Sequence, residues 1–207
     1  MKKIILFVAA FTFMISAQAM AMMVLSLNVE QLTNLAEKIF VGTCVSIEPQ
    51  TDAEGRRIIE VTYAVSETLK GSSESRVSFR QLAPPENGGE DVVRNGIRYH
   101  TSDVDLPSYS VGQENMIFLS EDGVLGLTAP IGITQGKFEI RQSVTGEKRI
   151  INSMGNEGLF RKTSKSPKIK ALTLDKKEKS LLNVTSGDVD LEDFKSLVKK
   201  IVQTHEN

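Results

Sequence analysis

The sequence predicts a mainly β protein, in which a small antiparallel barrel lies between a short N-terminal helix and a C-terminal amphipathic helix. Several short segments alternate apolar and polar residues, which is the period of a strand with one buried face. Helical spacing of apolar residues occurs near both ends of the mature chain, and no strand–helix–strand alternation indicates a parallel sheet. Several antiparallel strands flanked by helices are typical of a closed or partly open barrel.

The composition limits the function classes. A chain of 207 residues that is 40% hydrophobic and 25% charged has enough apolar residues for one domain with a core, which excludes collagen-like, coiled-coil and wholly disordered proteins. The net charge of −1 does not indicate a general nucleic-acid-binding protein. One cysteine and two histidines leave few ways to build a thiol or metal site, so we expect no metal and no cofactor.

Residues 1–21 are typical of a bacterial secretory signal peptide. Lys2 and Lys3 precede an uncharged apolar run over 4–15, and small residues follow it. That run is too short to span a bilayer, and no later segment is long enough, so we expect no membrane span. The prediction is an exported monomer, periplasmic or secreted, with the signal peptide cleaved after Ala19 or Ala21.

The mature chain begins with a helix and a hairpin. Asn28 as N-cap and Gln31 as its capping-box partner predict a helix from Val29 to about Lys38. The next two alternating segments, 39–48 and 57–69, predict a long antiparallel hairpin. One face of the first strand is expected to carry Ile39, Val41, Val45 and Ile47. The inward face of the second is expected to carry Ile59, Val61, Tyr63, Val65 and Leu69, with Thr62 facing outward.

Further strands complete the predicted barrel domain, which covers residues 22–160. They are expected at 76–82, at 115–120 with both faces buried, and at 137–142 and 148–152 as a last hairpin. Cys44, in the middle of the first long strand, is expected to be a small buried apolar side chain and not a nucleophile.

The C-terminal part divides into a connector and a helix. Residues 161–189 form a basic, flexible connector, and residues 190–207 carry the helix, which begins after the N-cap Asp190. The helix has an apolar stripe that we expect to pack on the barrel, because an exposed stripe is unfavourable on a monomer. The stripe consists of Leu191, Phe194, Leu197, Val198 and Ile201.

Two segments resemble a known type of barrel. LAEKIFVGTCVSIE (35–48) and VTYAVSETLKG (61–71) resemble the opening hairpin of the netrin-module and metalloproteinase-inhibitor barrels, which have OB topology. With VGQENMIFLS (111–120), QGKFEI (135–140) and DLEDFKSLVKKIV (190–202), the whole mature chain resembles an uncharacterised family of exported bacterial proteins. The resemblance implies an OB-like fold. It does not imply metalloproteinase inhibition, because those inhibitors chelate zinc with an N-terminal cysteine, whereas Cys44 lies within a strand.

The long segment from Ala83 to Ser110 is the candidate binding loop, because long irregular loops in compact domains often carry function. Its candidate partner-binding residues are Tyr99, His100, Asp103, Asp105 and Tyr109. We expect no catalytic residue, and we expect a non-enzymatic exported protein that binds an unknown macromolecular partner, with an exported protease as the first candidate. Two alternatives stay open: a hydrolase or metal-dependent enzyme with its site at His100, Asp103 and Asp105, or an envelope structural protein whose basic connector contacts anionic surfaces.

Overall fold

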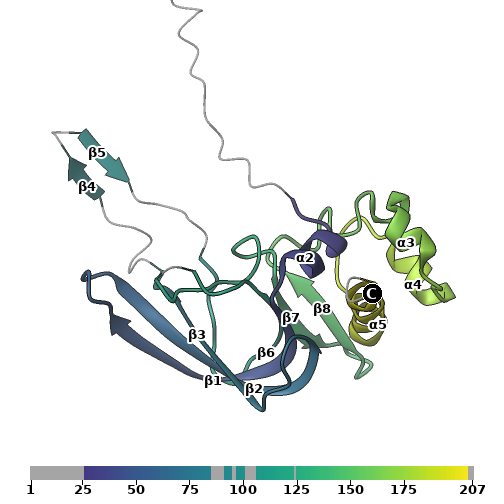
Figure 1. Ribbon diagram of the computed structural model, residues 1–207, viewed down its shortest axis with the longest axis horizontal. Coiled ribbons are helices and arrows are strands. Elements are labelled where there is room, and N and C mark those ends of the chain that lie inside the picture. Colours follow the sequence, from purple (N-terminus) through teal and green to yellow (C-terminus); the bar gives the residue numbers. More distant parts are fainter. Residues whose placement is uncertain (1–25, 85–90, 95–96, 101–105, 124, 205–207) are drawn as a thin grey trace, which may run out of the picture.

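The computed structural model describes residues 26–84, 91–94, 97–100, 106–123 and 125–204. Its main element is an antiparallel sheet of seven strands in the order β3-β2-β1-β6-β7-β8-β9 (Figure 1). These strands are β1 Lys38–Thr51, β2 Arg57–Lys70, β3 Arg76–Leu82, β6 Glu114–Leu119, β7 Lys137–Gln142, β8 Lys148–Asn152 and β9 Val189–Asp190. The helical elements are α2 Val29–Leu35, the 3₁₀ helix η2 Thr163–Lys165, α3 Pro167–Ala171, α4 Lys176–Leu181 and α5 Leu191–Gln203.

The predicted mainly β architecture with a C-terminal helix is confirmed, and the sheet is open. The strands β3 and β9 lie at its two ends, and the described strand pairings do not join them. The structure therefore does not show a closed barrel. The predicted strands at 76–82, 137–142 and 148–152 are present with the expected bounds.

The β1–β2 hairpin is present, but bulges change which residues share a face. Cys44 pairs with Tyr63 and Ser46 pairs with Thr62, so Val45 is an extra residue without a cross-strand partner. An extra residue reverses the alternation that follows it. Val45 is accordingly 37% exposed, and Ile47 packs with the cluster that contains Cys44. The expectation that Val45 and Ile47 share a face with Ile39 was wrong for this reason.

The sheet carries an apolar cluster on each of its two faces. The first cluster lies between the sheet and the helices α2 and α5, and it includes Met116, Phe118 and Phe138. The second cluster includes Ile117 and Leu119. Because neighbouring residues of β6 contribute to opposite clusters, the prediction that this strand is buried on both faces is confirmed.

The predicted inward face of β2 is also found in these clusters. Val61 and Tyr63 are fully buried in the second cluster, and Ile59 and Val65 pack against it. Leu69 belongs to the first cluster, because a further irregularity in the hairpin register separates it from Val65. The expectation of a shared inward face is therefore confirmed for the first four residues and was wrong for Leu69, which is buried on the opposite face.

Both terminal helices begin where the sequence predicts. Asn28 and Gln31 form the capping box of α2, although this helix ends at Leu35, earlier than expected. Asp190 caps α5 by accepting a hydrogen bond from the backbone N–H of Asp193. All five residues of the predicted stripe of α5 are buried, so the expected packing of the helix on the sheet is confirmed (Figure 1).

The segment 161–189 contains helical structure that the sequence analysis did not anticipate. It forms η2, α3 and α4, and Figure 1 shows α3 and α4 beside α5. Glu178 of α4 is fully buried, and its carboxylate accepts hydrogen bonds from Ser196 at 2.7 Å and from Lys200 at 2.6 Å. The apolar periodicity of the sequence does not reveal a buried charged side chain that makes such contacts.

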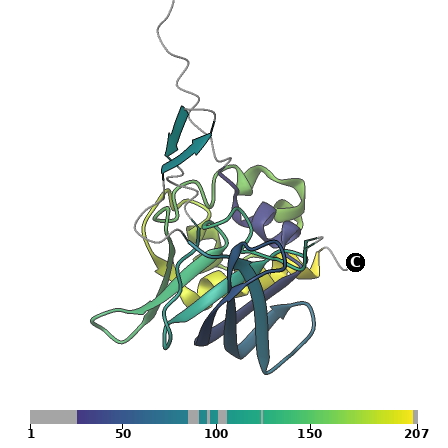
Figure 2. The same ribbon diagram turned by 90° about the vertical axis from the view of Figure 1, so that its left-hand side faces the viewer.

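The candidate binding loop is partly regular. It contains a two-stranded antiparallel hairpin of β4 (Asp91–Arg94) and β5 (Ile97–His100), which pair with each other and form a separate sheet. Figures 1 and 2 show this hairpin standing away from the seven-stranded sheet. The segment from Ala83 to Ser110 therefore contains regular structure within what the sequence analysis treats as an irregular loop.

Candidate functional site

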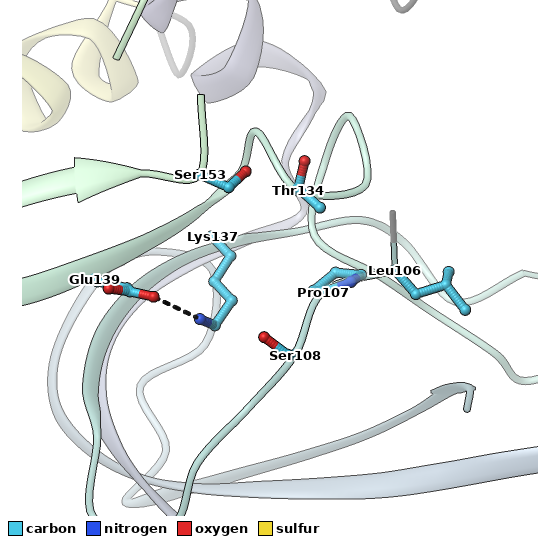
Figure 3. Close-up of a pocket in the computed structure, with 7 residues that line it drawn as sticks. All are labelled: Leu106, Pro107, Ser108, Thr134, Lys137, Glu139 and Ser153. Carbon is cyan, nitrogen blue, oxygen red and sulfur yellow. Dashed lines mark ion pairs between the residues drawn. The ribbon is translucent and has the colours of Figure 1, made fainter. Parts of the chain in front are cut away.

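A small cavity lies where the candidate binding loop returns to the sheet (Figure 3). It has a volume of about 240 Å³. Three parts of the chain form its walls. They are the returning loop, the strand β7 with the turn before it, and the residue that follows β8. The lining residues are Leu106, Pro107, Ser108, Thr134, Lys137, Glu139 and Ser153.

Lys137 is the unusual residue of this cavity, because a lysine is rarely so deeply buried. It is 8% exposed, and its ammonium points into the cavity toward Glu139 and Ser108 (Figure 3). The one ion pair found for it among the described residues is long, with 3.9 Å between Nζ and the carboxylate Oε1 of Glu139. The ammonium also lies 5.6 Å from the centre of the Tyr109 ring, within the range of a cation–π contact.

The electrostatics of the cavity are dominated by the burial of this ammonium. Burial lowers the pKa of Lys137 below its ordinary value of 10.5, and the negative charge of Glu139 opposes this only in part. Glu139 has other partners, since Arg141 donates to its Oε2 at 2.6 Å and Gln113 also hydrogen-bonds to it. These contacts lower the pKa of Glu139, so the carboxylate stays ionised without Lys137.

The returning loop is held firmly at this point. The Tyr109 hydroxyl donates to Gln81 Oε1 at 2.8 Å, and the Gln81 amide donates to the Pro107 carbonyl at 3.3 Å. The Tyr109 ring packs edge-to-face on Tyr63 and on Phe79. Gln81 is buried in β3, so the loop is fastened to the sheet by both polar and aromatic contacts, which makes the cavity a preformed feature of the fold.

The structure brings one of the five predicted site residues to this cavity. Tyr109 lies beneath the Lys137 ammonium. Tyr99 and His100 belong to β5, and Asp103 and Asp105 lie outside the described residues. Their grouping into one site therefore stays a prediction.

Lys137 was missed by the sequence analysis for a physical reason. Strand alternation places Lys137, Glu139 and Arg141 on the same face of β7, opposite the buried Phe138, which is the ordinary pattern of a solvated polar face. The loop at 106–109, far away in sequence, lies against the first of these side chains, whereas the other two are more exposed. No local pattern contains that information.

Cys44 behaves as the sequence predicts. It is 1% exposed in the second apolar cluster, and burial raises the pKa of its thiol. Its thiol contacts the backbone oxygen of Ser46 at 3.7 Å. A buried thiol with a raised pKa holds little thiolate at neutral pH, which disfavours a role as a nucleophile.

Comparisons with protein families, with curated proteins and with solved structures find no match to this chain. Within the part of the chain that the structure describes, no three histidine, cysteine or acidic side chains are grouped so as to hold a metal ion. In the same part, no helix has both the length and the apolar character that crossing a membrane requires.

Proposed function

We propose that this is an exported, non-enzymatic protein that binds a protein partner through the segment 83–110 and the Lys137 cavity at its base. The observation that carries the proposal is the Lys137 ammonium, which is buried in a preformed cavity and has only one distant carboxylate as an ionic partner among the described residues. A buried cation of this kind is costly unless an anion completes it. An acidic side chain of a partner supplies that anion.

The size of the cavity favours a side chain over a free cofactor. Its volume of about 240 Å³ is below the roughly 300–1,000 Å³ of typical small-molecule sites. A carboxylate side chain enters such a space while the rest of the partner stays outside. The β4–β5 hairpin, which pairs with no other described strand, belongs to the same segment and offers a second contact surface.

The proposal extends to the architecture and location of the protein. We propose an OB-like barrel, in which β1, β2, β3 and β6 curve around the second apolar cluster and Tyr109 packs against it from the loop. Export with cleavage after Ala19 or Ala21 is supported by the residue pattern of the N-terminus. An exported protease is the first partner to test.

Photo-crosslinking in intact cells tests the proposal. A photoreactive amino acid replaces Ser108, an exposed residue at the cavity, and in a matched strain it replaces Val144, a fully exposed residue in the β7–β8 turn. We expect one protein to be captured from position 108 and none from position 144. Adding Lys137→Met to the first strain is expected to remove the captured protein.

Two outcomes contradict the proposal. Capture that is equal at both positions, or that does not depend on Lys137, means that the cavity is not the binding site. A hydrolytic activity of the purified protein that His100→Ala abolishes favours the enzyme alternative. A purified exported protease that shows no binding to a molar excess of the protein is excluded as the partner.

A further inference from the structure

A second hollow lies beside the segment that follows β8, and the proposed function does not involve it. It is a groove of about 670 Å³, which is within the size range of small-molecule sites. The segment after β8, the 3₁₀ helix η2 and the chain between α4 and β9 form its walls. The lining residues that matter here are the apolar Phe160, Leu182 and Val184 and the cationic Arg161, Lys162 and Lys165.

The floor of the groove is apolar. Phe160 is a buried member of the first apolar cluster, and Leu182 and Val184 pack against that cluster while remaining partly exposed. Met154, which is 38% exposed, also lines the groove. The main core of the protein therefore reaches the surface here, and a ligand on this floor buries apolar area that is now in contact with water.

The rim of the groove is cationic. Arg161, Lys162 and Lys165 are exposed, and no ion pair is found for them with any described carboxylate. The Arg161 guanidinium donates to the backbone oxygen of Ser26 at 3.4 Å. The groove also has one acidic residue, Glu157, so three cations face one carboxylate.

The backbone of this rim is held in an unfavourable conformation. Lys162 has φ of 60°, in the left-handed region that a residue with a side chain rarely adopts. The next residue, Thr163, is fully buried, and its hydroxyl has no hydrogen-bond partner within the described structure. Backbone strain and an unsatisfied buried polar group in one short segment are typical of functional sites, where a loss of local stability accompanies a function.

We propose that this groove binds a single-chain anionic lipid, with the acyl chain on the floor and the headgroup on the cationic rim. The apolar floor alone would accept any acyl chain, whereas the three cations, which have no carboxylate partner among the described residues, select a negative headgroup. The left-handed turn at Lys162 places a cation at the edge of the groove, where a headgroup lies once the chain is buried.

Binding of two lysophospholipids to the mature protein tests the proposal. Lysophosphatidylglycerol and lysophosphatidylcholine carry the same acyl chain and differ in headgroup charge, and both are used below the concentration at which they form micelles. Native mass spectrometry and equilibrium dialysis measure the binding. We expect at least tenfold tighter binding of the anionic lipid, and we expect Lys162→Glu with Lys165→Glu to remove that preference.

Matched variants keep the test specific. Lys176→Glu with Lys179→Glu makes the same charge change on the exposed surface of α4 and is expected to leave binding unchanged. Val184→Asp is expected to abolish binding of both lipids, and thermal unfolding verifies that this variant is folded. Equal affinity for the two lipids, or an equal loss in the two double variants, overturns the proposal. Lys137→Met is expected to retain lipid binding, so failure of the partner-binding proposal is distinguishable from failure of this one.

Discussion

Replacing Lys137 by methionine is expected to stabilise the protein while removing its proposed binding activity. Methionine keeps most of the length and apolar contact of the lysine stem and removes the charge. The charge carries a desolvation cost of several kcal/mol, as expected for a buried ion. Its attraction to Glu139 at 3.9 Å is about 1–4 kcal/mol for an effective dielectric constant of 80 to 20.

The direction of the pKa shift decides between these opposing effects. The pKa of Lys137 is lowered in the folded protein, so the desolvation cost exceeds the attraction. Glu139 keeps its contacts with Arg141 and Gln113 in the variant, and no carboxylate is left isolated. After subtraction of a lost cation–π contact of about 0.5–1 kcal/mol, we expect a net stabilisation of about 1 kcal/mol.

Thermal and urea unfolding of the two proteins measures this difference. A change of about 1 kcal/mol raises the midpoint of thermal unfolding by about 2–4 °C for a chain of this size. Lys148→Met is the control, because Lys148 is half-exposed and pairs with Glu114 at 2.6 Å, and its loss is expected to cost less than about 1 kcal/mol. If Lys137→Met destabilises the protein by more than about 1 kcal/mol, contacts within the chain already compensate the buried ammonium. The proposal that it binds an anion of a partner is then refuted.

The pH dependence gives a second test of the same reasoning. Because the pKa of Lys137 is lower in the folded state, the unfolded chain binds more protons between that lowered pKa and about 10.5. The stability contribution of this group therefore rises with pH through that interval. We expect the advantage of Lys137→Met to be largest near neutral pH and to shrink as the pH approaches 10.5. An advantage that is constant with pH would show that the charge is not its cause.

Three further predictions concern the stability of the fold. Val61→Asp is expected to lower the free energy of unfolding by about 4 kcal/mol, because it buries an unpaired carboxylate. Thr62→Asp, on the opposite face, is expected to cost less than about 1 kcal/mol. Equal costs in urea unfolding would contradict the strand register. Gly42→Ala is expected to cost about 1–3 kcal/mol, since its Cβ would lie 2.7 Å from a backbone oxygen of β2; an unchanged unfolding midpoint would mean that the strands separate easily. Lys200→Met is expected to cost about 3 kcal/mol of unfolding free energy at pH 7, because it leaves the Glu178 carboxylate buried without its cation. Lys200 helps to lower the pKa of Glu178 in the unmutated protein. In urea unfolding the cost of the substitution should therefore diminish as the pH falls and Glu178 becomes protonated.

The strands and helix caps were predictable because their determinants are local. The capping box at Asn28 uses residues three apart, and the inward positions of Val61 and Tyr63 follow from the two-residue period of a strand. The stripe of α5 is equally local, since helical spacing collects its five apolar residues on one face. In each case the physical requirement is met within a few residues, and the sequence contains it directly.

The parts that failed depend on partners far away in the chain. The extra residue at Val45 exists only in relation to the pairing of Cys44 and Ser46 with the opposite strand, and the alternation before and after it looks regular in sequence. The helices within 161–189 depend on the buried contacts of Glu178 with α5. The many lysines of this segment indicate a solvated connector. The contacts of Glu178, which appear only in the tertiary structure, explain why it is folded instead.

The sequence by itself determined the mainly β class, the inward positions of Val61 and Tyr63, the burial of Cys44 and the packing of the last helix, because hydrophobic periodicity and capping residues carry that information over short distances. Only the tertiary structure shows that the ammonium of Lys137 is buried. Lys137 belongs to the polar face of a strand, and it is buried where the loop at 106–109 and the residues around Thr134 and Ser153 enclose it. Desolvation depends on everything that surrounds a side chain in space, and a single residue's neighbours in sequence do not specify it.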